Sequence, residues 1–338
     1  MTVQVAIIGG GVSGLSCAQV LQTAGISFAI FDKGRGAGGR LSTRRSDHGR
    51  FDHGTPFFSA QTPEFSAQVE QWRTQSRVAR WSPSTSPSPP TSLSPHEPSS
   101  FYVGTPGMNA VVKTDAQTLG VQFQTRIAPL MDARDGQQMK AQWHLTTEDE
   151  TPLIDAEWVV LAVPAEQSFD LIKNLKTSLN APLSAVRTTP CWSVMLAFEQ
   201  VLKDVQDVIF PSSDILDKAI RESAKPQRED GERWVLQATP KWSEDHLEDD
   251  PDMIISCLQN EFFHYANIPP QEKPFAPSFS RAHRWRFANT MSHFQNDYDL
   301  DSEYCIAVCG DWYRYTGVEG AWLSGKRLGA NLVQTLSR

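Results

Sequence analysis

Three glycines near the start of the chain have the spacing of a phosphate-binding turn. Gly9, Gly11 and Gly14 follow an apolar run over residues 3–8, and Asp32 stands 18 residues after Gly14. The first glycine permits a tight turn, the second lets backbone N–H groups approach a pyrophosphate, and the third lets a helix pack closely on a strand. A carboxylate at Asp32 would accept hydrogen bonds from ribose hydroxyls. The combination predicts a site for an adenine dinucleotide.

Such a site needs a strand, a helix and a second strand in that order. Residues 3–8 and 26–31 are apolar enough for two buried strands, and Gly25 is placed to stop the helix between them. Val12 and Ser13 would lie at the start of that helix, whose partial positive charge faces the phosphates. The inward face of the helix has apolar residues at helical spacing: Leu15, Ala18 and Leu21.

A second glycine-rich segment follows the acid. Gly38 and Gly39 would let backbone approach a diphosphate, and Arg40 would supply a planar, permanently charged donor fork. Many NAD-dependent dehydrogenases lack this double glycine, so it favours FAD. We assign Lys33 and Leu41, at either end of the segment, to the same site. The alternative for Arg40 is an ordinary solvated basic face.

Further motifs occur in order at residues 51–58, 102–108, 159–164, 309–312 and 318–325. Together with the double glycine they resemble the renalase family, in its bacterial branch, within the amine oxidase-like flavoproteins. The resemblance spans nearly the whole chain. It implies an α/β fold with an α+β insertion: a Rossmann-like FAD-binding domain of the p-hydroxybenzoate hydroxylase/amine oxidase type and an inserted mixed-sheet substrate domain.

The resemblance also implies further contacts to FAD. Asp311, after Gly310, would contact the ribityl and diphosphate groups; its alternative role is a helix-capping carboxylate. Ile127 lies where relatives present backbone to adenine. The remaining implied contacts are His53, Gly54 and Thr55, near the flavin, and the start of the last helix at Val318, Glu319, Gly320 and Ala321. N–H groups at that helix start would stabilise the negative charge of a reduced flavin.

By resemblance, the expected reaction is oxidation of the 2- or 6-dihydro isomers of NAD(P)H to NAD(P)+. The hydride would pass to FAD and the electrons to O2, giving hydrogen peroxide. No acid–base pair stands out, so no catalytic side chain is assigned. Two alternatives remain open: a related flavoenzyme acting on an amine or a polyene, and a flavin-binding sensor without turnover.

The predicted substrate residues are Trp192, Trp234, His283, Trp285 and Arg286. Alternate residues of a strand share a face, so His283 and Trp285 should point together and Arg284 and Arg286 the opposite way. A tryptophan could stack on a nicotinamide ring and an arginine could meet a phosphate. The alternative for each is a core tryptophan or a surface arginine. Arg44 and Arg45 more simply form solvated surface, and residues 221–226 depart from the Asn-Ser-x-Lys-Pro run of renalases.

Composition narrows the partners. The chain of 338 residues has a formal net charge of −8, which argues against nucleic acid or an anionic membrane as the main partner. No apolar run approaches the roughly 18 residues that span a bilayer. The first strand begins at Val3, leaving no room for a secretory signal, so we expect a cytoplasmic protein. The five cysteines form no C-x-x-C pair, so neither a redox disulfide nor a thiolate metal site is expected. No cysteine has the context in which monoamine oxidases attach flavin, so the resemblance implies non-covalent FAD. Oligomeric state stays open.

The chain should fold discontinuously. We expect an FAD-binding domain from residues 1–75, 101–165 and 286–338, and a substrate domain from 76–100 and 166–285. Residues 82–100, with eight serines and six prolines, predict a long exposed loop. Further strands are expected at 121–127, 142–145, 158–163, 192–198, 234–238 and 304–309, a helix at 251–265, and a solvated acidic loop at 244–252.

Overall fold

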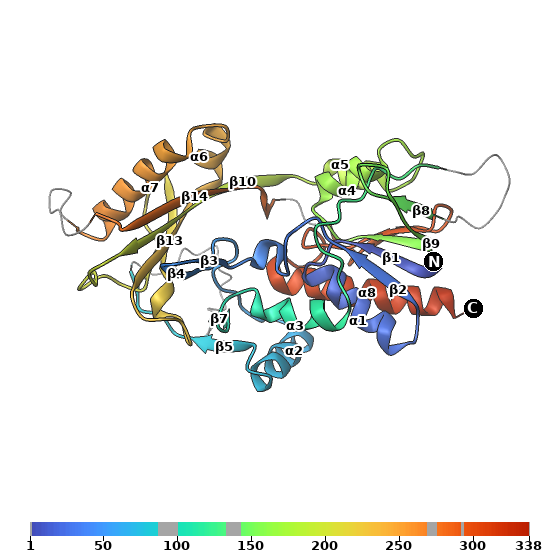
Figure 1. Cartoon of the computed structure of the whole chain (residues 1–338), viewed down its shortest axis with the longest axis horizontal. Coiled ribbons are helices and arrows are strands. Elements are labelled where there is room, and N and C mark those ends of the chain that lie inside the picture. Colours follow the sequence, from blue (N-terminus) through green and yellow to red (C-terminus); the bar gives the residue numbers. More distant parts are fainter. Residues whose placement is uncertain (1, 87–100, 133–142, 269–275, 292–293, 338) are drawn as a thin grey trace. The chain divides into compact units, whose positions relative to one another are not determined.

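The computed structural model describes residues 2–86, 101–132, 143–268, 276–291 and 294–337 (Figure 1). The chain divides into two compact, discontinuous units. The first unit comprises Met1–Gly39, Val112–Arg187 and Thr290–Arg338; the second comprises Arg40–Val111 and Thr188–Asn289. The structure thus gives residues 40–75, 101–111 and 286–289 to the second unit and 166–187 to the first, unlike the predicted domains. One reason is that Phe51 packs into a core with Met195, Ala197 and Val235 of the second unit.

The first unit is built on a sheet of order β15-β16-β9-β1-β2, with β8 paired to β9. Its inner strands β16, β9, β1 and β2 are parallel, whereas β15 and β8 are antiparallel to their neighbours. The strands are β1 (Thr2–Ile8), β2 (Phe28–Phe31), β8 (Trp143–Thr146), β9 (Pro152–Leu161), β15 (Asp299–Asp301) and β16 (Ile306–Val308). This parallel arrangement places the turn after β1 at the carboxyl edge of the sheet, where open α/β sheets bind ligands.

Helix α1 (Val12–Thr23) connects β1 to β2 and lies beside the last helix, α8 (Gly317–Leu336) (Figure 1). The predicted inward residues of α1 are buried, and the helix ends just before Gly25, whose φ is +72°. The shorter helices of this part of the chain are α3 (Ala110–Thr118), α4 (Ala165–Ile172) and α5 (Asn180–Ala185), with a 3-10 turn, η1, at Gly39–Leu41.

The predicted strand at 121–127 is wrong. Only two isolated bridges form there, Phe31 with Gln122 and Ile127 with Thr147. Between them Gln124 has a φ of +56°, which interrupts extended backbone. The strand predicted at 304–309 is also shorter, because Cys305 has a φ of +52° and β16 begins at Ile306.

The second unit contains a largely antiparallel sheet of order β14-β10-β13-β12-β11-β6. Helix α7 (Pro251–Tyr265), as predicted, packs Ile254, Leu258 and Phe262 into the core of this sheet. The strands are β6 (Thr85–Ser86), β10 (Thr188–Phe198), β11 (Val208–Ile209), β12 (Leu216–Arg221), β13 (Glu232–Ala238) and β14 (Phe279–Thr290). The other elements are helices α2 (Pro63–Thr74) and α6 (Pro240–Asp245), the turn η2 (Glu222–Ala224), and the strand pairs β3 (Arg44–Ser46) with β4 (Gly49–Phe51) and β5 (Val78–Trp81) with β7 (Phe101–Gly104).

Two predicted loops have more structure than expected. In the serine- and proline-rich segment, residues 87–100 lie outside the described residues, but Thr85–Ser86 forms β6 and pairs in parallel with β11. In the acidic tract, Glu244 and Asp245 end α6, and the Asp250 side chain caps α7 by accepting from the Asp252 N–H. Asp250 is therefore used to cap a helix start, where an acidic side chain is stabilising.

Candidate functional site

Two glycines of the phosphate-binding turn are required by close packing. Gly9 has a φ of +113°, and a Cβ there would stand 2.5 Å from the Ala162 carbonyl oxygen. A Cβ on Gly14 would lie 2.0 Å from the Gly9 carbonyl oxygen. Gly11 differs, because its φ is −83° and no atom lies within 4 Å of the Cβ position. Its missing side chain leaves open space directly before α1, as a bound phosphate requires.

The start of α1 and Asp32 together fit a nucleotide. Gly11 caps α1 without a side-chain hydrogen bond, so the first-turn N–H groups are available to an acceptor. Asp32 Oδ2 accepts from the Gly10 N–H at 2.8 Å and Oδ1 from the Gly34 N–H at 2.6 Å. These bonds orient the carboxylate, and each oxygen keeps a further lone pair for a ribose hydroxyl.

The double glycine at Gly38 and Gly39 also has backbone conformations that favour glycine. Gly38 and Gly39 have φ values of +134° and +53°, and no atom lies within 4 Å of a Cβ on Gly39. Lys33 instead directs its ammonium to the Gln167 Oε1 atom at 2.8 Å, and Ile127 is buried beside its bridge to Thr147. Gly39 therefore leaves open space where a side chain would stand, whereas the Lys33 side chain is engaged within the protein.

Helix α8 runs in the same direction as α1. A Cβ on Gly325 would stand 2.0 Å from the Ser13 carbonyl oxygen, and one on Gly329 would stand 2.9 Å from that of Cys17. Since α8 begins at Gly317, its N-terminus extends about 10 Å beyond that of α1 at the usual rise per residue. Thr316 caps α8 without a side-chain hydrogen bond. The first unit therefore has two staggered helix starts suited to negative charge.

The segment before α8 is tightly packed. The Gly310 N–H donates to Ser324 Oγ at 3.0 Å, and a Cβ on Gly310 would stand 2.1 Å from the Trp312 ring. Asp311, Val318, Glu319 and Gly320 are buried and Ala321 is half-buried. Close packing thus explains Gly310, and the buried Asp311 lies six residues before the start of α8 at Gly317.

Within the second unit, the loop at 53–55 is fixed against Arg40. The Thr55 N–H donates to the Arg40 carbonyl oxygen at 2.8 Å, and a Cβ on Gly54 would stand 2.1 Å from the same oxygen. Gln237 Nε2 donates to the Gly54 carbonyl oxygen at 2.5 Å. Leu41, the next residue after Arg40, is buried. The Arg40 side chain donates from Nη1 to the Ala288 carbonyl oxygen at 3.4 Å.

Three of the predicted side chains meet in a ring cluster, which we define as His53, His283 and Trp285. The His53 ring centroid lies 4.7 Å from that of His283 and 5.3 Å from that of Trp285, and the latter two are 4.6 Å apart. Trp285 Nε1 donates to the His53 carbonyl oxygen at 2.8 Å. Sequence alternation correctly predicted that His283 and Trp285 share a face of β14.

Both imidazoles of the ring cluster are neutral at ordinary pH. Burial, followed by the charges of His283 and Arg44, lowers the pKa of His53 to about 3. Burial, followed by Arg44 and Arg281, lowers the pKa of His283 to about 4. The cluster is therefore an uncharged aromatic surface with guanidinium groups nearby.

The structure separates Arg286 from the ring cluster. Arg286 Nη1 donates to Glu248 Oε1 at 2.7 Å, and Arg284 Nη1 donates to Glu248 Oε2 at 2.6 Å. Both arginines lie on the opposite face of β14, as alternation predicted. Arg286 is exposed and paired there, which corrects its assignment to the substrate.

Trp192 and Trp234 belong to the hydrophobic core of the second unit. Trp234 is 0% exposed, packs on Phe262 with ring centroids 4.7 Å apart, and donates from Nε1 to Glu232 Oε1 at 2.6 Å. Trp192 Nε1 donates to the His246 carbonyl oxygen at 2.9 Å. The predicted substrate contacts of both residues are corrected accordingly, because burial and a satisfied indole N–H give each one a core role.

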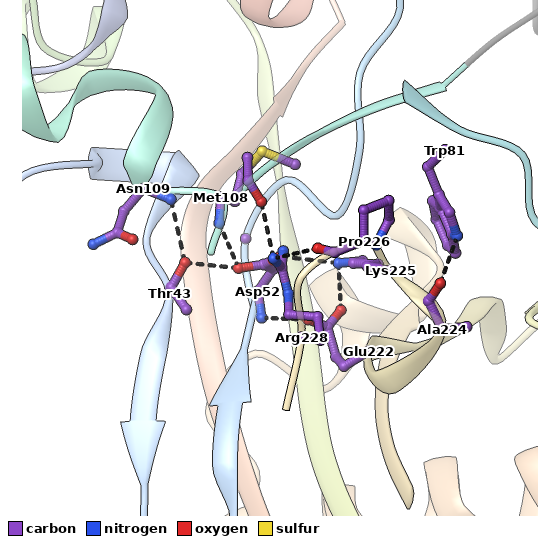
Figure 2. Close-up of polar contacts among 12 residues, drawn as sticks. Thr43, Asp52, Trp81, Met108, Asn109, Glu222, Ala224, Lys225, Pro226 and Arg228 are labelled. Atoms are coloured by element: carbon purple, nitrogen blue, oxygen red, sulfur yellow. Dashed lines mark hydrogen bonds and ion pairs between the residues drawn. The ribbon is translucent and has the colours of Figure 1, made fainter. Parts of the chain in front are cut away.

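Sequence reasoning missed a buried charge cluster, which we define as Asp52, Glu222, Lys225 and Arg228. Figure 2 shows these side chains converging on Asp52, whose Oδ2 accepts from Lys225 Nζ at 3.0 Å and from Arg228 Nη2 at 2.6 Å. All four side chains are 0% exposed. A signal was present in sequence, since Asp52 lies within the 51–58 motif and Lys225 within the divergent 221–226 segment.

The charge cluster is balanced, with two acids and two bases. Burial opposes ionisation of Asp52, but the adjacent Lys225 and Arg228 outweigh it and hold the pKa of Asp52 well below its usual range. Burial raises the pKa of Glu222, which shares Lys225 with Asp52. The remaining Asp52 oxygen accepts from Thr43 Oγ1 at 2.6 Å and from the Met108 N–H at 2.8 Å. Asp52 thereby joins three chain segments that are distant in sequence.

The described residues contain neither a candidate metal centre nor a helix suited to span a membrane. No group of three or more histidine, cysteine, aspartate or glutamate side chains is arranged to hold a metal ion within the described ranges. No helix in the described part of the chain has the length and apolar character needed to cross a membrane.

Comparison with known proteins supports this architecture. A family profile for NAD(P)-binding Rossmann-like domains matches residues 7–72. Cyclohexylamine oxidase from Brevibacterium oxydans IH-35A has a similar structure, with a TM-score of 0.74, 13% identity, and coverage of 99% of this chain and 100% of that one. Putrescine oxidase bound to putrescine gives a TM-score of 0.71, 13% identity and 99% coverage of both chains. A protein assigned as protoporphyrinogen oxidase from Exiguobacterium sp. 255-15 gives a TM-score of 0.72 at 13% identity, with coverage of 98% of this chain and 99% of that one. The chain therefore has the mixed α/β fold of amine oxidase-type enzymes, with a Rossmann-like dinucleotide-binding part.

Proposed function

We propose that this protein is an FAD-dependent oxidoreductase that oxidises the 2- or 6-dihydro isomers of NAD(P)H to NAD(P)+. The open space at Gly11 and Gly39, the oriented carboxylate of Asp32 and the two helix starts whose N-cap residues make no side-chain hydrogen bond support the cofactor. The similarity in fold to amine oxidases supports a flavin-dependent oxidation.

The observation that carries the choice of substrate is the ring cluster. Its two imidazoles are neutral, and the charges that act on His283 come from Arg44 and Arg281. A protonated amine would be repelled by such surroundings, whereas a neutral dihydropyridine ring would not. The carboxylate of Asp52, which acts on His53, is neutralised within the charge cluster.

In the proposed mechanism a bound flavin would accept a hydride from the substrate and pass two electrons and one proton to O2, which takes its second proton from solvent to give hydrogen peroxide. The dihydropyridine ring would stack on Trp285 with the nearly perpendicular His283 ring at its edge, so that the carbon that loses hydride has one orientation. The hydrogen bond from Trp285 to the His53 carbonyl oxygen fixes the indole plane. Hydride loss leaves a cationic pyridinium, and the face of Trp285 stabilises that charge as it forms. No proton has to be removed by the protein.

Anaerobic mixing of the purified yellow protein with each donor tests this function. We expect rapid bleaching of the flavin by 2- or 6-dihydro-NAD and little response to ordinary NADH. Bleaching only by cyclohexylamine or putrescine would replace the proposal with an amine oxidase. An absence of reduction by any donor would favour a flavin sensor, and protein that takes up no FAD would overturn the cofactor assignment.

A further inference from the structure

The face of β14 that carries the ring cluster also carries an arginine. Arg281 lies two residues before His283 and four before Trp285, so all three side chains share one face of the strand. At the usual strand rise, Arg281 lies about 7 Å from His283 and about 13 Å from Trp285 along the strand. Arg281 is exposed and makes no ion pair with a carboxylate among the described residues.

A second arginine approaches this face from the β3–β4 hairpin. Arg44 pairs with Phe51 in that hairpin, and the Phe51 ring stacks on Phe279 of β14 with centroids 5.4 Å apart. Since Phe279 lies two residues before Arg281, the hairpin packs on the face of β14 that carries the ring cluster. The charges of both Arg44 and Arg281 act on His283. Two guanidinium groups therefore converge on one end of the ring cluster.

The arginines on the other face of β14 are occupied differently. Arg284 and Arg286 both donate to Glu248. The sequence had suggested that a member of this pair meets a phosphate, but their partner is a carboxylate. Among the arginines of this strand, Arg281 is thus the one placed beside the ring cluster.

We infer that Arg281 and Arg44 form a phosphate subsite next to the ring cluster, which binds the diphosphate of a dinucleotide whose ring stacks on Trp285 beside His283. This inference rests on the proposed function and extends it to the substrate's anionic part. Guanidinium groups bind phosphate oxygens with charge-assisted, bidentate hydrogen bonds. An extended arginine side chain and the intervening ribose span the separation along β14. Phosphate would also neutralise the charge of Arg281, which lowers the electrostatic cost of forming a pyridinium nearby.

Substituting Arg281 tests the subsite with two donors that differ in phosphate. The concentration dependence of anaerobic flavin bleaching is measured with 2-dihydro-NAD and with 1-methyl-1,2-dihydronicotinamide, which has no phosphate. For Arg281→Gln we expect the apparent Kd of the dinucleotide to rise about ten-fold or more, at an unchanged limiting rate. The phosphate-free donor should react with Arg281→Gln as it does with wild type. Arg44→Gln should repeat this pattern, provided that its bound FAD spectrum is unaltered.

Arg286→Gln is the matched control, because it removes the same charge from the opposite face of the same strand. It should leave the Kd of both donors unchanged. An unaltered dinucleotide Kd in Arg281→Gln, or an equal loss for both donors, would overturn the subsite.

Direct binding of NAD+ separates this inference from the proposed function. Calorimetric titration should show wild-type affinity weakening with added salt, and Arg281→Gln should bind more weakly with less dependence on salt. If NAD+ binds in this way but no dihydronicotinamide bleaches the flavin, the proposed function fails and the subsite stands. If wild type binds no NAD+ and shows no phosphate preference, the subsite fails.

Discussion

At the scale of single residues, the charge cluster shows how much depends on one carboxylate. Asp52 accepts from Thr43, Met108, Lys225 and Arg228, and its own N–H donates to Glu222 Oε2 at 3.0 Å. Asp52 directly precedes His53 of the ring cluster. Its network therefore connects the segment after the double glycine with the residue that supports Trp285.

Removing the Asp52 charge should be strongly destabilising. Asp52→Asn leaves two buried bases with one acid, and we expect the free energy of unfolding to fall by about 3–5 kcal/mol in chemical denaturation. The control is Asp170→Asn, which breaks an exposed ion pair with Lys173 and should change the free energy of unfolding by less than about 1 kcal/mol. Because a neutral pair costs less than an unpaired charge, Asp52→Asn with Lys225→Met should recover part of the loss. Equal effects of Asp52→Asn and Asp170→Asn would contradict the cluster's role.

The ring cluster predicts a loss of stability in mild acid. Below about pH 6.5 the histidines of the unfolded chain take up protons. In the folded chain the pKa of His283 is lowered to about 4 and that of His53 to about 3, so both stay neutral there. Unfolding therefore gains protons, and stability falls with decreasing pH by at most about 1.4 kcal/mol per pH unit for each histidine. Denaturation between about pH 7 and 5 measures this slope. His53→Gln should make it shallower; an identical slope would contradict the assignment.

At the scale of elements, the parallel contact of α1 with α8 sets the relation between the two helix starts. Backbone approach at Gly325 permits this contact, because a side chain there would meet the Ser13 carbonyl. Gly11 lies two residues before Ser13, in the turn that precedes α1, and no atom of the protein fills the space where its side chain would stand. Glycines in one neighbourhood thus serve packing at one position and ligand approach at another.

Two glycine substitutions separate these roles. Gly325→Ala should destabilise the protein by about 1–3 kcal/mol, because the helices must move apart. Gly11→Ala has an allowed φ and no protein neighbour, so the apoprotein should unfold at the wild-type temperature. Its FAD titration should nevertheless show a large loss of affinity. Normal FAD affinity in Gly11→Ala would contradict the placement of a phosphate next to Gly11.

At the scale of the whole molecule, the assigned FAD contacts lie in both units. The contacts expected in the first unit are the glycine turn, Asp32 and the start of α8, and those expected in the second are Arg40 and the loop at 53–55. A ligand that binds only the folded state stabilises every part it contacts, by about 2.7 kcal/mol at a hundred-fold excess over Kd.

Hydrogen exchange with and without FAD tests the assignment in each unit. We expect slower exchange over residues 11–14 and 317–320 and also over residues 53–55. The surface helix α7 serves as an internal reference and should keep its exchange rate. Protection limited to the first unit would remove His53, Gly54 and Thr55 from the cofactor contacts.

The sequence by itself determined the features that depend on near neighbours. The glycine spacing, the apolar periodicity of α1 and α7, and the alternation along β14 act within a few residues, so β1, α1, β2 and Asp32 could be predicted. Only the tertiary structure decided which polar and aromatic side chains meet. Asp52 and Lys225 are 173 positions apart, and nothing local distinguishes core Trp234 from Trp285 of the ring cluster. Their roles follow from burial and from partners that folding brings together, because ion pairing and packing depend on distance in space and not on distance along the chain.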